Sequence, residues 1–364
     1  MEAKKRITYL DMAKGIGICT MIVVHTFGSF VASDNKPYFA FFLSYFGSFT
    51  MALFLIVSGI LLVITKAEQK DLKQSMKRKI KTLILPYFVF SGIYLAIDFF
   101  MQPGAFSPKF YLDALVSTLT GAGVSVLWYM PALFIAEFLL LFGIRKPGKR
   151  KLFFSLLYLG LGLLCMYFSD ICRWSLWNEN EGLFIVGRLV TVVMRSLVCT
   201  MLLMAGYYGG KLLVKREKFS IIELILGILG MTVTGLLCMN NGVIDMNTMY
   251  FGNMWLYLCF ALLGAFGIVL VCKNLPNIWP ITWIGKNSLI IMLTHQDFLV
   301  LLHAKTFAYW VNQFTVKGKD IVLFLVLFAF MAVCEILTVR IFDKAFPALI
   351  GKSEPKGDKK AASK

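Results

Sequence analysis

Long apolar runs dominate the chain, and short polar segments separate them. Ten runs are long enough to cross a bilayer, since a membrane-spanning helix needs about 20 mostly apolar residues. They cover residues 11–32, 39–65, 82–101, 126–144, 152–169, 187–210, 219–239, 253–272, 280–302 and 321–342. A helix satisfies its own backbone hydrogen bonds, which lipid cannot do for it. The pattern therefore predicts an all-α, polytopic membrane protein with about ten transmembrane helices.

The composition agrees with this membrane class. Of the 364 residues, 59% are hydrophobic and only 16% are charged, whereas soluble domains are nearer half apolar and a quarter charged. The apolar runs follow one another too closely to leave room for a separate soluble domain. We expect one membrane domain over residues 1–343. The polar, charged residues 344–364 are expected to form a basic, disordered cytoplasmic tail.

The net charge of +17 could suggest a nucleic-acid partner, but the distribution of the charge argues against one. Most of the lysines and arginines fall in alternate connecting segments. These segments are 66–81, 145–151, 211–218 and the tail after Phe342. Basic residues collect on the cytoplasmic side of membrane proteins. We therefore predict cytoplasmic termini and a multi-pass protein of the cell membrane, and no nucleic-acid partner.

Three ionisable residues from distant runs are predicted to lie at one depth in the membrane. A rise of about 1.5 Å per residue puts His25 and His295 about 21 Å from the inner boundary, and Arg195 about 12 Å from the outer one. The hydrocarbon core is about 30 Å thick, so all three fall in one layer near the outer face. Ionisable groups inside a bilayer are expensive and usually functional. His25, His295 and Arg195 are therefore the candidate catalytic residues.

Structural alternatives remain open for the buried ionisable residues. Arg195 could instead reach the outer surface or pair with a carboxylate. His295 could bond a backbone carbonyl. Glu137 and Glu335 are predicted to face the interior of the bundle, as structural partners at least as readily as catalytic groups.

A charged cluster opens the first run. Arg6 precedes it, and Asp11 and Lys14 lie three residues apart, so they share a helix face and can pair. Asp11 could also act as a helix N-cap. Gly15 and Gly17 follow and allow another helix or a ligand to approach closely.

Cysteines and outer connecting segments add little chemistry. The eight cysteines lie mostly in apolar runs and form no CxxC pair, so we expect neither a metal site nor a disulfide framework. The segment 102–125 is expected to hold a short interfacial helix near 109–119. The segment 170–186 carries Trp174 and Trp177, which suit either an interface belt or stacking on a glycan.

The motifs together resemble those of a known family. Arg6, Leu10, Asp11, Lys14 and Gly15, followed ten residues later by His25, resemble the first-helix signature of the acyltransferase 3 family of integral membrane acyltransferases. Further similar segments are Phe54–Gly59, the basic pair Arg78 and Lys79, Leu127–Leu133, and Trp283–Leu289 followed by His295. The resemblance extends over nearly the whole chain and is nearest to the fucose O-acetylase-like branch. In one departure, residues 290–294 lack the tyrosine that the family often has there.

The resemblance implies transfer of an acyl group from cytoplasmic acyl-CoA, with acetyl-CoA as the expected donor. The acceptor it implies is a hydroxyl of a glycan or another cell-envelope component, as in O-acetylation of a polysaccharide. His25 would then be the essential residue. Arg6, Asp11 and Lys14 would belong to the donor end, where Asp11 is a further candidate catalytic residue, and Arg78 and Lys79 would face the CoA. No metal is implied.

The residues themselves fit this chemistry. A hydroxyl that attacks a thioester needs a base, and histidine is the usual one. Arg195 lies at the right depth to stabilise the oxyanion. Direct transfer and an acyl-His25 intermediate both remain open, as do the identity of the acceptor and the oligomeric state. A proton-coupled transporter of a small solute would also use buried His, Asp and Arg. A non-catalytic sensor that keeps CoA binding is a third possibility.

Overall fold

The computed structural model describes residues 7–30, 37–101, 107–172, 181–215, 218–296 and 320–350. Helices make up nearly all of these residues, and no β-strand occurs among them. The predicted all-α membrane class is therefore confirmed. Arg6, Trp174, Trp177 and the tail beyond residue 350 lie outside the described residues.

The described part of the chain folds into helices of very different length. The main helices are α1 (Thr8–Phe30), α2 (Pro37–Ile64), α3 (Leu72–Lys79), α4 (Leu85–Met101), α5 (Pro108–Thr120), α6 (Tyr129–Ile144), α7 (Gly148–Tyr167), α9 (Glu181–Leu213), α10 (Ile221–Leu237), α11 (Met254–Asn274), α12 (Trp279–Lys286), α13 (Ser288–Thr294) and α15 (Asp320–Ala345). Short 3₁₀ helices η2 (Ala67–Gln69), η4 (Ser125–Trp128), η5 (Cys238–Asn240) and η6 (Pro347–Ile350) and a π-helical turn η3 (Ile80–Ile84) connect them.

Eight helical stretches among the described residues are long and apolar enough to cross a membrane. They are Ala40–Ile64, Leu72–Phe100, Pro108–Ile144, Gly148–Tyr167, Phe184–Leu213, Ile221–Asn240, Met254–Asn274 and Leu325–Ala345. The first and ninth predicted spans are not among them. The count of ten and the cytoplasmic termini therefore stay predictions.

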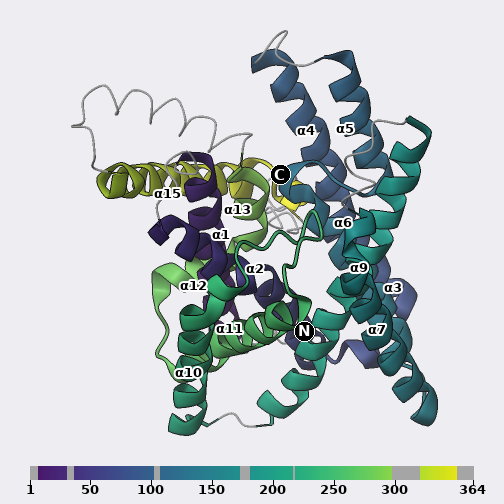
Figure 1. The fold of residues 1–364 in the computed structure, drawn as a ribbon, viewed down its shortest axis with the longest axis vertical. Helices are drawn as coiled ribbons and strands as arrows, with labels where there is room; N and C mark the ends of the chain where they lie inside the picture. Colours follow the sequence, from purple (N-terminus) through teal and green to yellow (C-terminus); the bar gives the residue numbers. More distant parts are fainter. Residues whose placement is uncertain are drawn as a thin grey trace, which may run out of the picture.

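The expected helix near 109–119 is present as α5. Ser107 caps it by accepting a hydrogen bond from the backbone amide of Phe110, and Gly121, with φ of 79°, ends it. Tyr87 of α4 donates a hydrogen bond of 2.8 Å to the backbone oxygen of Thr118. In Figure 1, α4 and α5 accordingly run side by side. The interfacial position of α5 stays a prediction.

Two groups of helices meet at α2 (Figure 1). On one side α9 packs on α2, α6 and α7. On the other side α1, α10, α11 and α12 form a second group, in which α1 contacts α2, α11 and α12. α15 crosses α1 and α13. α1, which precedes α2 in the chain, thus belongs to the second group, whereas α6, α7 and α9, which follow α2, belong to the first.

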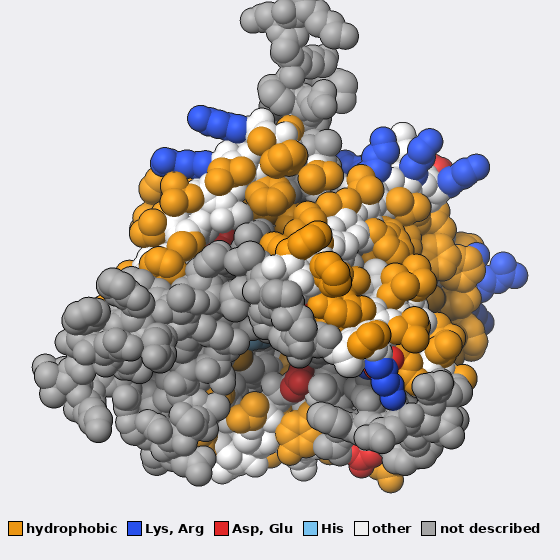
Figure 2. Space-filling view, turned by 90° about the horizontal axis from the view of Figure 1, so that it is seen from above, with side chains coloured by type: hydrophobic (Ala, Val, Ile, Leu, Met, Phe, Trp, Pro, Cys, Tyr) orange, Lys and Arg blue, Asp and Glu red, His pale blue; other side chains and the backbone are white. Residues whose placement is uncertain are grey.

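Hydrophobic side chains cover much of the exterior, as a membrane protein requires. On the face in Figure 2 they form broad areas, whereas Lys and Arg side chains project from the rim. Leu156, Leu212, Ile222 and Leu236 are among the exposed hydrophobic residues, each more than half exposed. Such an area would be a liability in water but is the normal surface in lipid.

Glycines bring α1 and α12 into backbone contact. A Cβ on Gly15 would lie 2.0 Å from the backbone oxygen of Ile281, and one on Gly285 would lie 1.7 Å from that of Asp11. Both distances are far below van der Waals contact, so only glycine fits at either position. Small residues allow such close packing between membrane helices. The first-helix motif and the Trp283–Leu289 motif therefore meet at this crossing.

Replacing Gly285 by alanine is expected to destabilise the protein. The new methyl group would push α12 away from α1, and forced overpacking typically costs about 1–3 kcal/mol. Gly160→Ala on α7 is the matched control, because a Cβ there would meet nothing within 4 Å. We expect a lower thermal midpoint in detergent for Gly285→Ala and an unchanged or higher one for Gly160→Ala. Equal midpoints for the two variants would contradict this account of the crossing.

Candidate active site

Two histidines from distant parts of the chain meet inside the bundle. His25 lies on α1, and His295 directly follows α13. Their ring centroids are 5.2 Å apart with an interplanar angle of 45°. His295 is completely buried, whereas His25 is half-buried. The two rings therefore form one site, in which His25 is the more accessible member.

The hydrogen bonds of His295 define its tautomer. Its Nδ1 lies 3.0 Å from the backbone oxygens of both Ile291 and Met292. Both partners are acceptors, so Nδ1 must carry a proton. The neutral ring then has its lone pair at Nε2, which is buried and has no hydrogen-bond partner among the described residues. The structural alternative for His295, a bond to a backbone carbonyl, is thus present, whereas its catalytic role stays a prediction.

Glu335 joins this region from α15. The hydroxyl of Thr294, the residue before His295, lies 2.8 Å from Glu335 Oε2 and 2.9 Å from the backbone oxygen of Ile290. The carboxylate is buried, and its Oε1 has no partner within the described part of the chain. An incompletely bonded carboxylate in such a place is costly and suggests a functional role.

A largely apolar cavity of about 400 Å³ borders the same helices. Its wall includes Glu335 of α15 and, on α1, Ile18 and Ile22. Ile18, Ile22 and His25 are spaced four and three residues apart, so they lie along one face of α1. The cavity thus follows the helix face that leads to His25.

Arg195 is buried but is bonded to connecting segments. Its Nη1 donates to the side-chain and backbone oxygens of Asn247, at 2.6 and 3.1 Å, and its Nη2 donates to the backbone oxygen of Ala122 at 2.7 Å. The guanidinium also lies over the ring of Trp128, 4.8 Å from the centroid. None of these hydrogen bonds reaches either histidine. Arg195 therefore holds the connecting segments that contain Ala122 and Asn247 against the bundle.

Asp11 and Lys14 pair at the start of α1, as expected. Lys14 Nζ lies 2.8 Å from Asp11 Oδ1, and the Asp11 side chain is buried. They lie beside the glycine crossing with α12, about 17–21 Å along the helix from His25. The pair thus marks the opposite end of α1 from the histidines, and Arg6 lies outside the described residues.

A cavity of about 700 Å³ with both apolar and basic side chains in its wall lies near the C-terminal end of α2. Basic side chains line it together with residues that can donate hydrogen bonds: Lys70, Gln74, Ser75, Arg78, Lys79 and Thr82. Ser58 of α2 and Glu137 of α6 also line it. Both members of the predicted basic pair, Arg78 and Lys79, thus share one cavity wall.

Lys79 is not available as a free cation in this cavity. Its Nζ forms an ion pair of 2.7 Å with Glu137, whose side chain is almost completely buried. Lys70, which sequence reasoning did not single out, lines the same wall. Gln74 and Arg78 are spaced four residues apart and so point to one side of α3, whereas Lys70 precedes that helix in an extended conformation. The helical spacing was therefore a signal for Gln74 but not for Lys70.

An ionic network fixes the turn that borders this cavity. Glu68 accepts a hydrogen bond from Tyr207 and pairs with Lys151 and Lys211 at 3.4 and 3.5 Å. Burial alone would raise the pKa of Glu68, but these partners lower it below its usual value. Arg145 donates a hydrogen bond of 2.8 Å to the backbone oxygen of Ala67, and burial lowers its pKa. The cavity therefore has a rigid, basic rim.

Among the described residues, no group of three or more His, Cys, Asp or Glu side chains could hold a metal ion. Within these residues the cysteines are free thiols.

These features define a multi-pass helical membrane protein with an ionisable site inside the bundle. The sequence pattern of the acyltransferase 3 family, described as an acyltransferase domain, matches residues 7–340. The chain belongs to this family and is an acyltransferase of a class that transfers groups other than aminoacyl groups. Comparison with curated proteins and with solved structures gives no match.

The contact between Thr294 and Glu335 predicts a measurable loss of stability in Thr294→Val. Valine cannot donate a hydrogen bond, and a buried acceptor left without its partner costs about 1–3 kcal/mol. Thr338→Val on α15 is the control, since the Thr338 hydroxyl bonds only the backbone oxygen of Cys334 in its own helix. Each variant loses one hydrogen bond from a threonine hydroxyl to a backbone oxygen of its own helix. The difference between their thermal midpoints therefore reports the contact of Thr294 with the Glu335 carboxylate. A difference of zero would exclude that contact.

Proposed function

We propose that the protein is a membrane O-acyltransferase of the cell envelope that uses cytoplasmic acyl-CoA, with acetyl-CoA as the donor. The acceptor is a hydroxyl of a glycan or another envelope component. The observation that carries the proposal is the contact between half-buried His25 and fully buried His295 within the bundle. A half-buried imidazole can meet a substrate and accept its proton.

The basic cavity supports CoA as the donor. CoA carries several phosphate charges, and Lys and Arg side chains bind phosphate through charge-assisted hydrogen bonds. Arg78 is the basic residue proposed to bind a phosphate here, because Lys79 is already paired with Glu137. Topology alone would also place basic residues in 66–81, but it does not require them to line one cavity.

The donor must reach deep into the bundle. Thr20 of α1 and Thr50 of α2 are hydrogen-bonded at 2.9 Å and give a common level for these antiparallel helices. From that level His25 lies about 7.5 Å toward one side, and Ser58, at the wall of the basic cavity, about 12 Å toward the other. The acyl group must therefore travel roughly 20 Å, at the end of the flexible arm of CoA.

The proposed reaction follows from these positions. The acceptor hydroxyl gives its proton to His25 as its oxygen attacks the carbonyl carbon of the thioester. A C–O bond forms, the C–S bond breaks, and the proton passes to the sulfur of CoA. His295 and Glu335 act as positioning residues. His295 is buried behind His25, and Glu335 is buried beside His295. An acyl-His25 intermediate would use the same residues.

Other predicted residues keep narrower roles in this proposal. Arg195 as the oxyanion donor stays a prediction, and its bonds to Ala122 and Asn247 favour a positioning role. Asp11 and Lys14 are proposed to shape the donor end of α1, where they pair. Arg6 is proposed for the same end on the resemblance alone.

Replacing His25 by alanine tests the proposed base. We expect acyl transfer from radiolabelled acetyl-CoA in membrane vesicles to fall by a factor of about 10²–10⁴, because general base catalysis typically contributes that much. Binding of CoA to the purified variant should be unchanged, because the basic cavity is remote from His25. A His25→Ala protein that retains full transfer would exclude this role. Proton-coupled uptake of a solute without any acyl transfer would instead support the transporter.

Replacing Arg78 by alanine tests the proposed CoA site. Loss of one charge-assisted contact with phosphate is expected to raise the KM for acetyl-CoA by about tenfold, or about 1.4 kcal/mol. Lys149→Ala is the matched control, because Lys149 is a basic, exposed residue of the next positively charged segment and does not line the cavity. Equal KM values for Arg78→Ala and Lys149→Ala would place the CoA elsewhere.

A further inference from the structure

The apolar cavity of about 400 Å³ is a groove that opens on the exterior of the bundle. Side chains of α1, α12, α13 and α15 form its wall. Ile18 and Ile22 of α1 are buried and form its floor. On the open side, Trp279 of α12 is 69% exposed and Ile336 of α15 is 38% exposed. In a membrane protein such an apolar exterior faces lipid.

One face of α15 forms the longest wall of the groove. Phe328, Ala332, Ile336 and Val339 line it, and their spacing of three or four residues places them on one side of the helix. The stretch from Phe328 to Val339 is about 17 Å long. One leaflet contributes about half of a hydrocarbon core of about 30 Å, or about 15 Å. The groove is therefore long enough to hold one lipid tail along its length.

Much of α15 has no protein against it. Only 22% of its candidate span, Leu325–Ala345, is buried, compared with 67% for Phe184–Leu213. α15 crosses α1 and α13 (Figure 1), and the groove lies between it and α12. A tail in the groove would fill the space that these helices leave between them.

A basic side chain lies at the edge of this apolar groove. Arg340 lines the cavity and is exposed, and its guanidinium has no ion pair or hydrogen bond among the described residues. Arginine binds phosphate through paired, charge-assisted hydrogen bonds. Arg340 lies five residues before Ala345, about 7.5 Å from the end of the span. Its long side chain can therefore reach the level of the lipid phosphates.

The charges at this edge select the kind of head group. Asp343 also lines the cavity, one turn beyond Arg340. Its negative charge disfavours a head group with two negative charges, so a phosphodiester that carries an amine is the better match. An arginine near a helix end can reach the interface without any specific ligand, but that explanation does not require an open apolar groove beside it.

We propose that this groove binds one phospholipid of the bilayer, with a tail along α15 and its phosphate against Arg340. The lipid covers the open side of the groove and holds α15 against α1 and α12. Glu335 of α15 accepts a hydrogen bond from Thr294, the residue before His295. The lipid thus helps to fix the carboxylate beside the histidines. Binding of the lipid does not rest on the proposed function.

Lipid binding can be measured on the full-length protein purified in dodecyl maltoside, without acyl-CoA. The probe is phosphatidylethanolamine with a photoactivatable diazirine in one tail, and mass spectrometry identifies the cross-linked peptides. Saturable cross-links are expected on the groove segments of α12 and α15. Unlabelled phosphatidylethanolamine should compete for them. Dioleoylglycerol, which has the same kind of tails but no phosphate, should compete about tenfold less well or worse.

Two substitutions test the tail and the phosphate separately. Ala332→Trp fills the groove and should abolish the cross-links there. Val333→Trp is its control, because Val333 is the exposed neighbour on α15 and does not line the groove. Arg340→Gln should weaken binding by about tenfold through loss of the contact with phosphate. Lys344→Gln is the second control, because Lys344 is basic and exposed but lies outside the groove.

The outcomes separate this inference from the proposed function. Equal cross-linking of wild type and Ala332→Trp, or equal competition by phosphatidylethanolamine and dioleoylglycerol, would overturn the phospholipid site. Cross-links confined to other exposed surfaces would show annular lipid only and would also overturn it. Saturable lipid binding without any acyl transfer would count against the proposed function alone. Thermal midpoints of the variants show whether each one is folded.

Discussion

The close crossing of α1 and α12 is the constraint on which the reaction site depends. Gly15 and Gly285 leave no room for a side chain, so the backbones of the two helices touch. α13 follows α12 after Asn287, and this fixes the level at which His295 meets α1. Without the crossing, no backbone contact would hold α1 and α13 at the level where His25 meets His295. The first-helix motif and the Trp283–Leu289 motif, which are separated by most of the chain, thus form one helix–helix contact.

Buried polar groups in this bundle fall into two kinds. The ion pair of Glu223 with Lys273, at 2.6 Å, leaves neither charge without a partner. His295 Nε2 and Glu335 Oε1 have no hydrogen-bond partner among the described residues, and the same holds for Arg195 Nε and Glu137 Oε2. Satisfied groups hold helices and loops together, whereas unsatisfied ones in a low-dielectric interior are costly unless they are used. The first two of these atoms belong to the region of the histidines, where we propose the reaction.

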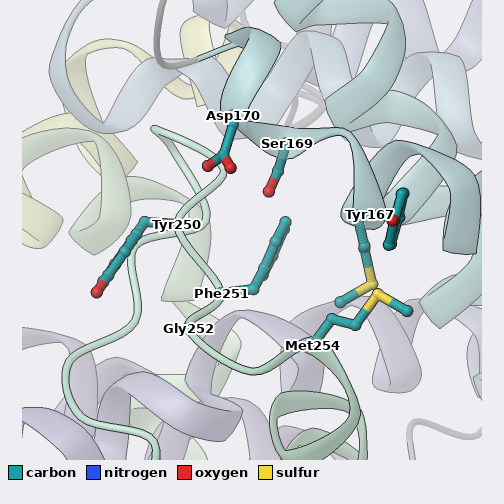
Figure 3. A pocket seen from close by; sticks show the side chains of 8 residues that line it. Tyr167, Ser169, Asp170, Tyr250, Phe251, Gly252 and Met254 are labelled. Atoms are coloured by element: carbon teal, nitrogen blue, oxygen red, sulfur yellow. The ribbon is translucent and has the colours of Figure 1, made fainter.

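Two cavities of the molecule differ in charge. The cavity beside α3 has a basic wall and a rim fixed by Glu68 and Arg145, which suits a polyanionic donor. A smaller hollow of about 240 Å³ at the end of α7 is lined by Tyr167, Ser169 and Asp170 among others and has no basic residue in its wall (Figure 3). α7 runs between them, and the histidines lie inside the bundle. Such an arrangement fits an enzyme whose two substrates arrive from different aqueous phases.

The sequence by itself determined the helical membrane class, because long apolar runs in lipid must satisfy their own backbone hydrogen bonds. Helical rise and the order of the runs also sufficed to place His25 and His295 at one depth. Tertiary structure alone decided that the rings of His25 and His295 lie together, that Lys79 forms an ion pair with Glu137 and that Arg195 is hydrogen-bonded to loop carbonyls. Depth along a helix follows from local geometry. Rotation about its axis and the choice of neighbour depend on contacts between distant segments, which no local pattern contains.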